Sequence, residues 1–125
     1  MSPRLRLTST VLDSPEPGVL ADFYRHLLGL EETGERDPDW IVLRNPHGGP
    51  GLSFQREARH VRPAWPAAPG EQQMQDHLDI AVDDLQAAVA HAVAGGAHVE
   101  EFQPQETVRV LRDPHGHLFC LYLPD

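Results

Sequence analysis

A segment of seven residues occurs twice in this chain of 125 residues, and no other feature constrains the fold as strongly. The sequence VLRNPHG at 42–48 returns as VLRDPHG at 110–116, and the two copies differ only at Asn45 and Asp113. Two copies are too few for a solenoid, which needs more and shorter repeats. The repeat therefore predicts a duplicated module, with a Pro-His-Gly turn between two strands in each copy.

Apolar residues at helical spacing predict one helix in each half, and both stripes are expected to pack in a core. The stripes consist of Leu20, Phe23, Tyr24, Leu27 and Leu28 in the first half and of Leu85, Ala88, Val89, Ala92 and Val93 in the second.

Residues at the helix ends support these two helices. Ser14, which precedes a proline, suits the start of the first helix, and Asp83 or Asp84 can cap the second. Gly29 and Gly95 are expected to end the two helices, because glycine readily takes the left-handed conformation of a helix end.

Four strands are predicted in each half from alternating and β-branched segments. They lie near 5–13, 31–34, 40–44 and 51–55, and near 77–82, 98–102, 107–112 and 118–123.

The order of elements is thus β-α-β-β-β in both halves, and residues 1–125 are expected to form a single α+β domain. The first module spans about residues 4–58 and the second about residues 76–124. Residues 59–75 are predicted to be a linker, because the segment is rich in proline.

Charge and hydropathy exclude several classes of partner. The net charge of −9 repels a phosphate backbone, so we expect no nucleic-acid partner. No apolar run is long enough to cross a membrane, and no signal peptide is recognised, so we expect no membrane partner and a cytoplasmic location. Cys120 is the only cysteine, which excludes an internal disulfide.

Five stretches of sequence carry a resemblance to a known family. They are VLDSPEP at 11–17, LADFYRHLLG at 20–29, GLSFQR at 51–56, HLDIAVDDL at 77–85 and DPHGHLFC at 113–120. With the two β-α-β-β-β modules, they resemble the vicinal oxygen chelate superfamily of glyoxalases, bleomycin-resistance proteins and dioxygenases, in its glyoxalase-like domain branch. The resemblance implies curved sheets around a shared cavity, a small organic ligand and a homodimer.

The same resemblance implies where a metal would bind in relatives that need one. Their four ligand positions correspond to Ser9, Ser53, His77 and Cys120 in this chain, and Gln55 is a possible substitute for Ser53. Only His77 is a ligand type usual in that family, and serine hydroxyls are weak donors for divalent cations. We therefore expect no cofactor and no metal ligand, with a divalent metal as the alternative.

Strand alternation places His77 and Asp79 on the polar face of their strand, opposite Leu78 and Ile80. An imidazole beside a carboxylate can transfer protons, and the alternative is that both only line a binding pocket.

Cys120 is expected on the same side of the module as His77. A Cys-His pair can give a nucleophilic thiolate if the imidazole lowers the thiol pKa. The alternative is an inert, buried thiol.

Aromatic and turn residues complete the candidates. Trp65, in the linker, either closes the mouth of the cavity or pins the linker to the body. Trp40 is expected in the core, and His115 and His117, in the repeated turn, are expected to be solvated.

Three functions follow, in order of preference. The first is a protein that binds or sequesters a small organic ligand without a metal. The second is a metal-dependent lyase, isomerase or dioxygenase of the glyoxalase type, and the third is a metal-free enzyme with His77 and Asp79 as acid and base. The candidate catalytic residues are His77, Asp79 and Cys120, and the candidate ligand-binding residues are Ser9, Ser53, Gln55, Trp65, His77, Asp79 and Cys120.

Overall fold

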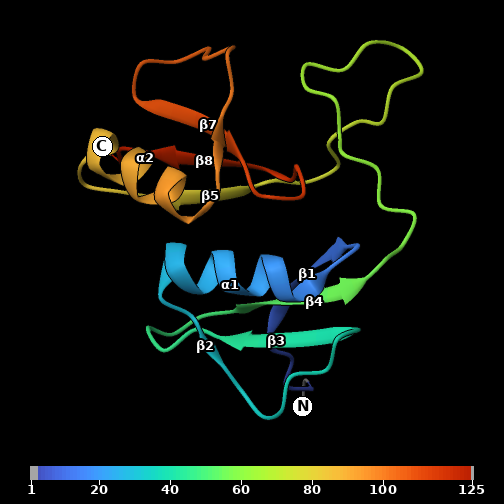
Figure 1. Cartoon of the computed structure of the whole chain (residues 1–125). Helices are drawn as coiled ribbons and strands as arrows, with labels where there is room; N and C mark the ends of the chain where they lie inside the picture. Colours follow the sequence, from blue (N-terminus) through green and yellow to red (C-terminus); the bar gives the residue numbers. More distant parts are fainter. Residues whose placement is uncertain (1–2, 125) are drawn as a thin grey trace. The chain divides into compact units, whose positions relative to one another are not determined.

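Each half of the chain folds as a four-stranded sheet with one helix across a face (Figure 1). The computed structural model describes residues 3–124; its first unit ends at Ala58 and its second begins at Arg59. The first unit contains β1 (Ser9–Ser14), α1 (Pro17–Leu28), β2 (Glu31–Glu32), β3 (Trp40–Arg44) and β4 (Gly51–Arg56). The second contains β5 (Leu78–Ala81), α2 (Leu85–Gly95), β6 (His98–Val99), β7 (Val108–Arg112) and β8 (Leu118–Tyr122). The predicted α+β class and element order are confirmed.

In each unit, the first and last strands are neighbours and run parallel. The strand order is β1-β4-β3-β2 in the first sheet and β5-β8-β7-β6 in the second, and the remaining neighbours are antiparallel. Paired residues of adjacent strands point to the same face of a sheet. This pairing therefore decides which side chains from distant parts of the sequence share a face.

The first unit builds its core between α1 and one face of its sheet, as the apolar stripe predicts. The rings of Tyr24 and Phe54 stack with their centroids 5.7 Å apart, and both side chains are fully buried. Alternate residues of the sheet face the helix, and those that are buried with Phe54 are Ile41, Leu43 and Leu52.

The second helix packs less deeply than its stripe predicts. Ala92 is the only residue of α2 that is buried, and Val93 is 46% exposed. Alanine side chains are too short to interlock with the sheet, so the core of this unit is carried mainly by Leu111, Phe119 and Leu121 from the strands. Within residues 3–124, neither helix has the length and apolar character needed to span a membrane.

The repeated segment forms the same turn in both units, as predicted. The side chains of Asn45 and Asp113 each accept a hydrogen bond of 2.9 Å from the backbone N–H two residues later. The glycine that ends each turn has a positive φ, 94° at Gly48 and 88° at Gly116, which a residue with a Cβ rarely adopts. The turn chemistry explains why these residues recur together.

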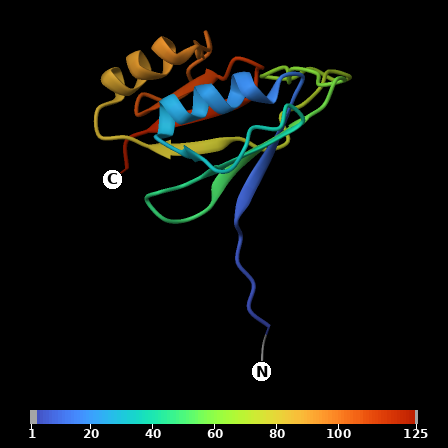
Figure 2. The same ribbon diagram turned by 60° about the horizontal axis from the view of Figure 1, so that its bottom comes forward.

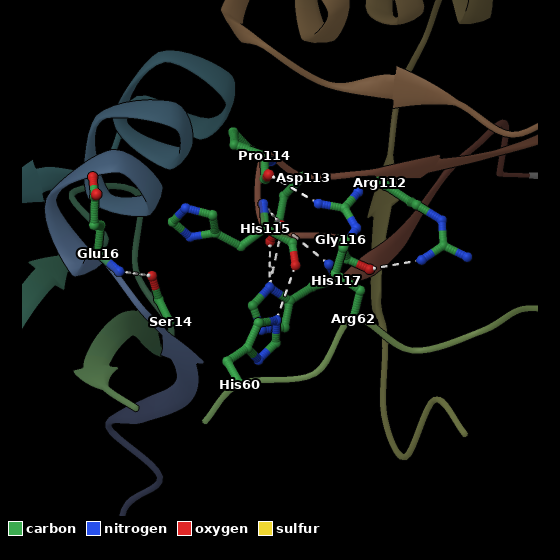
Figure 3. Close-up of polar contacts among 10 residues, drawn as sticks. All are labelled: Ser14, Glu16, His60, Arg62, Arg112, Asp113, Pro114, His115, Gly116 and His117. Carbon is green, nitrogen blue, oxygen red and sulfur yellow. Dashed lines mark hydrogen bonds and ion pairs between the residues drawn. The ribbon is translucent and has the colours of Figure 1, made fainter. Parts of the chain in front are cut away.

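Asp113, at the one position where the two copies differ, makes additional hydrogen bonds in the second turn. The fully buried carboxylate of Asp113 also accepts a hydrogen bond from the backbone N–H of His117 at 3.0 Å, and its other oxygen lies 2.9 Å from His117 Nδ1 (Figure 3). The prediction that His117 is solvated is therefore wrong. Its side chain is 17% exposed, and its ring stacks on that of His60 with the centroids 4.8 Å apart.

Several element boundaries differ from the prediction, and β2 and β6 are shorter than the predicted 31–34 and 98–102. β1 begins at Ser9 rather than near residue 5, because its partner strand begins at Gly51, whose N–H bonds the Thr8 carbonyl. α1 begins at Pro17, because the buried Ser14 hydroxyl accepts the backbone N–H of Glu16 and forms a turn before the helix (Figure 3). α2 extends through Gly95, and Gly96 caps its end in the left-handed conformation.

The proline-rich linker is bound to the second unit by hydrogen bonds to the repeated turn and its strand. The guanidinium of Arg112 donates to the carbonyl of Pro63 at 2.6 Å, and Arg62 donates to the carbonyl of Pro114 at 3.3 Å. His60 Nε2 lies 2.9 Å from the carbonyl oxygen of His115. The start of the linker is therefore part of the second unit.

The two turn residues provide a matched test of this architecture. Asp113→Ala is expected to lower the free energy of unfolding by about 3 kcal/mol, because it leaves buried donors without an acceptor. Asn45→Ala, in the more exposed copy, is expected to cost about 1 kcal/mol or less. Denaturant unfolding of both variants measures the difference, and equal losses would show that burial of Asp113 adds nothing to the turn.

Candidate functional site

Each sheet has one face against its helix and an opposite face that carries polar side chains. In β5 and β8, the fully buried Phe119 and Leu121 belong to the helix side, whereas Asp79, Cys120 and Tyr122 belong to the other. The candidate residues therefore lie on the open face of each sheet, which is the face away from the helix.

In the second unit, three candidate residues lie together. Asp79 and Cys120 are register partners in the parallel pair, and His77 precedes β5 on the same side. His77 Nε2 lies 3.1 Å from Asp79 Oδ1, and one donor atom from each of the three residues falls within 4.8 Å of the others. The cluster is open to solvent, since the side chains of His77 and Asp79 are 37% and 62% exposed.

The environment of Cys120 opposes formation of a thiolate. Burial raises the pKa of the thiol above its ordinary value, and the negative charge of Asp79, with a hydrogen bond to that carboxylate, raises the pKa further. The predicted nucleophile requires a shift in the other direction. The structure thus places Cys120 beside His77 but favours the neutral thiol at neutral pH.

The donor set of this cluster fits one class of metal. An imidazole, a carboxylate and a thiol are ligands of zinc and similar borderline cations, whereas magnesium and calcium prefer oxygen alone. Three protein ligands with a free position is the arrangement of catalytic zinc sites. The thiol must lose its proton to bind, which a bound cation promotes and the carboxylate of Asp79 opposes.

In the first unit, the serines at the implied ligand positions bind each other. The hydroxyl oxygens of Ser9 and Ser53 are 2.7 Å apart, and Ser53 is 1% exposed. Further along the same face, Gln55 Nε2 donates to Asp13 Oδ1 at 3.1 Å. Both pairs arise from the β1–β4 register, which brings this face of the two strands together.

Trp40 is a candidate that the sequence interpretation missed. It was expected in the core, but 42% of its surface is exposed, and its register partner in β4 is Gln55. Ile41 and Leu43 face the helix, so strand alternation places Trp40 on the open face. The same alternation, applied to residues 40–44, was the available signal.

Trp65 lies against the second unit. Its ring packs on Phe102 with a centroid distance of 5.5 Å, which matches the alternative in which Trp65 pins the linker to the body. The expectation that it closes a cavity stays a prediction, as does the shared cavity itself.

Comparison with known proteins places the chain in a family. Residues 9–122 match the family of the glyoxalase-like domain, so this chain belongs to that family and to the vicinal oxygen chelate superfamily. No curated protein matches the sequence.

Solved structures share the fold at low sequence identity. A glyoxalase/bleomycin resistance protein/dioxygenase family enzyme from Burkholderia phytofirmans PsJN is 20% identical, with a TM-score of 0.70 over 94% of this chain and 97% of that one. A possible glyoxalase from Bacillus cereus is 15% identical, with a TM-score of 0.67 over 95% and 99%. A glyoxalase/bleomycin resistance protein from Albidiferax ferrireducens T118 is 18% identical, with a TM-score of 0.64 over 95% and 98%. These likenesses support the fold and leave the reaction open.

The electrostatics of the cluster can be tested at Cys120. Asp79→Asn removes the charge that raises the thiol pKa, so we expect the alkylation rate of Cys120 at neutral pH to increase. The measurement is the pH profile of reaction with iodoacetamide in the wild type and in the variant. Asp76→Asn, an exposed acid before the cluster, serves as the control and is expected to leave the profile unchanged. A profile that is the same after Asp79→Asn would contradict the assigned role of that carboxylate.

Proposed function

We propose that this protein binds a small organic ligand on the open faces of its sheets. The observation that carries the proposal is the gathering of polar and aromatic side chains on those faces, beside valines such as Val11 and Val110, while the largest buried side chains face the helices. Membership of the glyoxalase-like domain family supports it, because binding sites of this kind are concave surfaces with a few fixed polar groups. The ligand-binding residues are Ser9, Ser53, Gln55, His77, Asp79 and Cys120, to which Trp40 is added.

The first unit suggests the chemical class of the ligand. The exposed ring of Trp40 offers a flat apolar surface, and the Asp13–Gln55 pair lies beside it in the register. An aromatic face attracts cations, and the net charge of −9 favours them over anions. A planar, positively charged organic molecule is therefore the preferred ligand.

Tryptophan fluorescence tests this proposal directly. The chain has two tryptophans, so Trp65→Phe leaves Trp40 as the single reporter. We expect saturable quenching by planar aromatic cations, and little response to anions built on the same ring. In this background, Asp13→Asn is expected to weaken binding about tenfold through loss of a charged partner.

A matched variant separates the site from general charge effects. Glu35→Gln removes an exposed carboxylate from the same unit and is expected to leave binding unchanged. Equal binding of cations and anions, or no saturable response across the panel, would refute the proposed ligand class.

A second candidate function is metal-dependent chemistry, favoured by the approach of His77, Asp79 and Cys120 within 4.8 Å. These three residues would hold a zinc-type cation. When bound, such a cation polarises an oxygen atom of the substrate or lowers the pKa of water. His77 would bind as neutral imidazole, and Asp79 would offset part of the charge of the cation.

Without a metal, the same geometry suits the third function. Asp79, 3.1 Å from His77 Nε2, would stabilise an imidazolium formed when His77 accepts a proton. The homodimer and the cytoplasmic location expected from the sequence stay predictions.

Zinc binding distinguishes the metal-dependent function from the other two. If the metal-dependent function is correct, protein prepared without a histidine tag retains about one equivalent of zinc after dialysis. The His77→Ala and Cys120→Ser variants are each expected to lose this zinc. His26→Ala, on the exposed side of α1, is the matched control and is expected to retain zinc. Equal retention in all variants, or none in the wild type, would reject this candidate.

A further inference from the structure

Among residues 3–124, a cavity at one end of the first sheet is lined by two arginines and by no acidic side chain. It lies where β3 ends and β4 begins, beside the segment that leads into β1, and its volume is about 460 Å³. Figure 2 shows that segment, in blue, continuing outward past the end of β1. The lining includes two arginines, two threonines and two apolar residues: Arg6, Arg44, Thr8, Thr33, Leu7 and Val42.

The charge of this lining differs from that of two other cavities. The groove between β5 and α2 is lined by Asp83 and Asp84. The pocket at the start of α1 is lined by Glu16 and Asp22 beside its arginines. The whole chain has a net charge of −9, but salt screens charges more than about 10 Å apart. The two arginines therefore make this cavity locally positive and suited to an anion.

Both guanidinium groups keep N–H donors for a ligand. Arg44 donates from Nη2 to Glu31 Oε2 at 2.8 Å, and its other nitrogens remain available, because a guanidinium carries five N–H donors. Within residues 3–124, Arg6 forms no ion pair. The carboxylate of Glu31 opposes an anion, but an exposed ion pair of this kind contributes little and can be exchanged for a ligand.

The remaining residues of the lining indicate a ligand that is more than a free ion. The hydroxyls of Thr8 and Thr33 can donate to further oxygen atoms, while Leu7 and Val42 offer apolar surface. Guanidinium groups bind phosphates and carboxylates through paired hydrogen bonds. The volume lies within the range of small-molecule sites. The lining is therefore suited to an oxyanion attached to a small apolar body.

We propose that this cavity binds a small organic molecule through a phosphate or carboxylate group, with Arg6 and Arg44 as its charged partners. Two guanidinium groups favour a phosphate monoester, because it carries close to two negative charges at neutral pH. The proposal does not rest on the ligand proposed above, because none of the binding residues named for that ligand lines this cavity. Trp40 lies four residues before Arg44 along β3, roughly 13 Å away, so the two ligands would bind at separate places.

An NMR titration of the full chain with four probes tests the proposal. The probes are phenyl phosphate, benzoate, inorganic phosphate and the neutral benzyl alcohol. We expect saturable shifts of the backbone amides at Thr33, Asn45 and Gly49, with the tightest binding for phenyl phosphate and none for benzyl alcohol. Arg6→Gln and Arg44→Gln are each expected to raise the dissociation constant of phenyl phosphate about tenfold.

A neighbouring arginine provides the matched control. Arg4→Gln removes an exposed arginine of the same segment that does not line the cavity, so it is expected to leave binding unchanged. Tighter binding of benzoate than of phenyl phosphate would support the site and identify a carboxylate as its preferred group. Inorganic phosphate that binds as tightly as phenyl phosphate would overturn the assignment of an organic ligand. An equal loss in Arg4→Gln, equal binding of benzyl alcohol, or no saturable shift at these amides would overturn the site itself.

Discussion

The parallel pairing of the first and last strands within each module is the constraint on which the candidate site depends. The register joins Ser9 to Gly51 and Val11 to Ser53 in one sheet, and Asp79 to Cys120 in the other. A shift by one residue would send the polar side chains of one strand to the helix and its apolar ones to solvent. The buried phenylalanines Phe54 and Phe119 oppose such a shift, because each must stay on the helix side.

Much of the fold could be predicted from the sequence, because turns and strands leave local signals. The repeated turn followed from residues whose side chains bind their own backbone, and the order of elements followed from apolar spacing. Burial of whole side chains was harder to predict. Trp40 and the stripe of α2 were expected in the core, yet Trp40 falls on the open face and α2 buries only Ala92. A hydrophobic side chain favours burial, but whether it is buried depends on the surface that packs against it.

The proximity of three candidate residues could be predicted from the sequence, and their electrostatics could not. Alternation placed His77, Asp79 and Cys120 on a common side, and the structure brings their donor atoms together. The pKa of Cys120 could not follow from spacing, because it depends on burial and on a charge on the adjacent strand. Asp79 lies 3.1 Å from His77 Nε2, and its charge disfavours an ionised Cys120. The surroundings of Cys120 therefore oppose nucleophilic attack by its sulfur.

The hydrogen bonds that hold the linker determine where the chain can be cut between its two repeats. Arg62 and Arg112 tie residues 62–63 to the second repeat, so the seam between the repeats lies at the end of the first and not midway along the connection. A dissected second half would carry the connecting segment as part of its own architecture, because the hydrogen bonds of Arg62 and Arg112 lie within that unit. A cut between Ala58 and Arg59 would therefore break fewer of the linker's hydrogen bonds than a cut within the proline-rich segment.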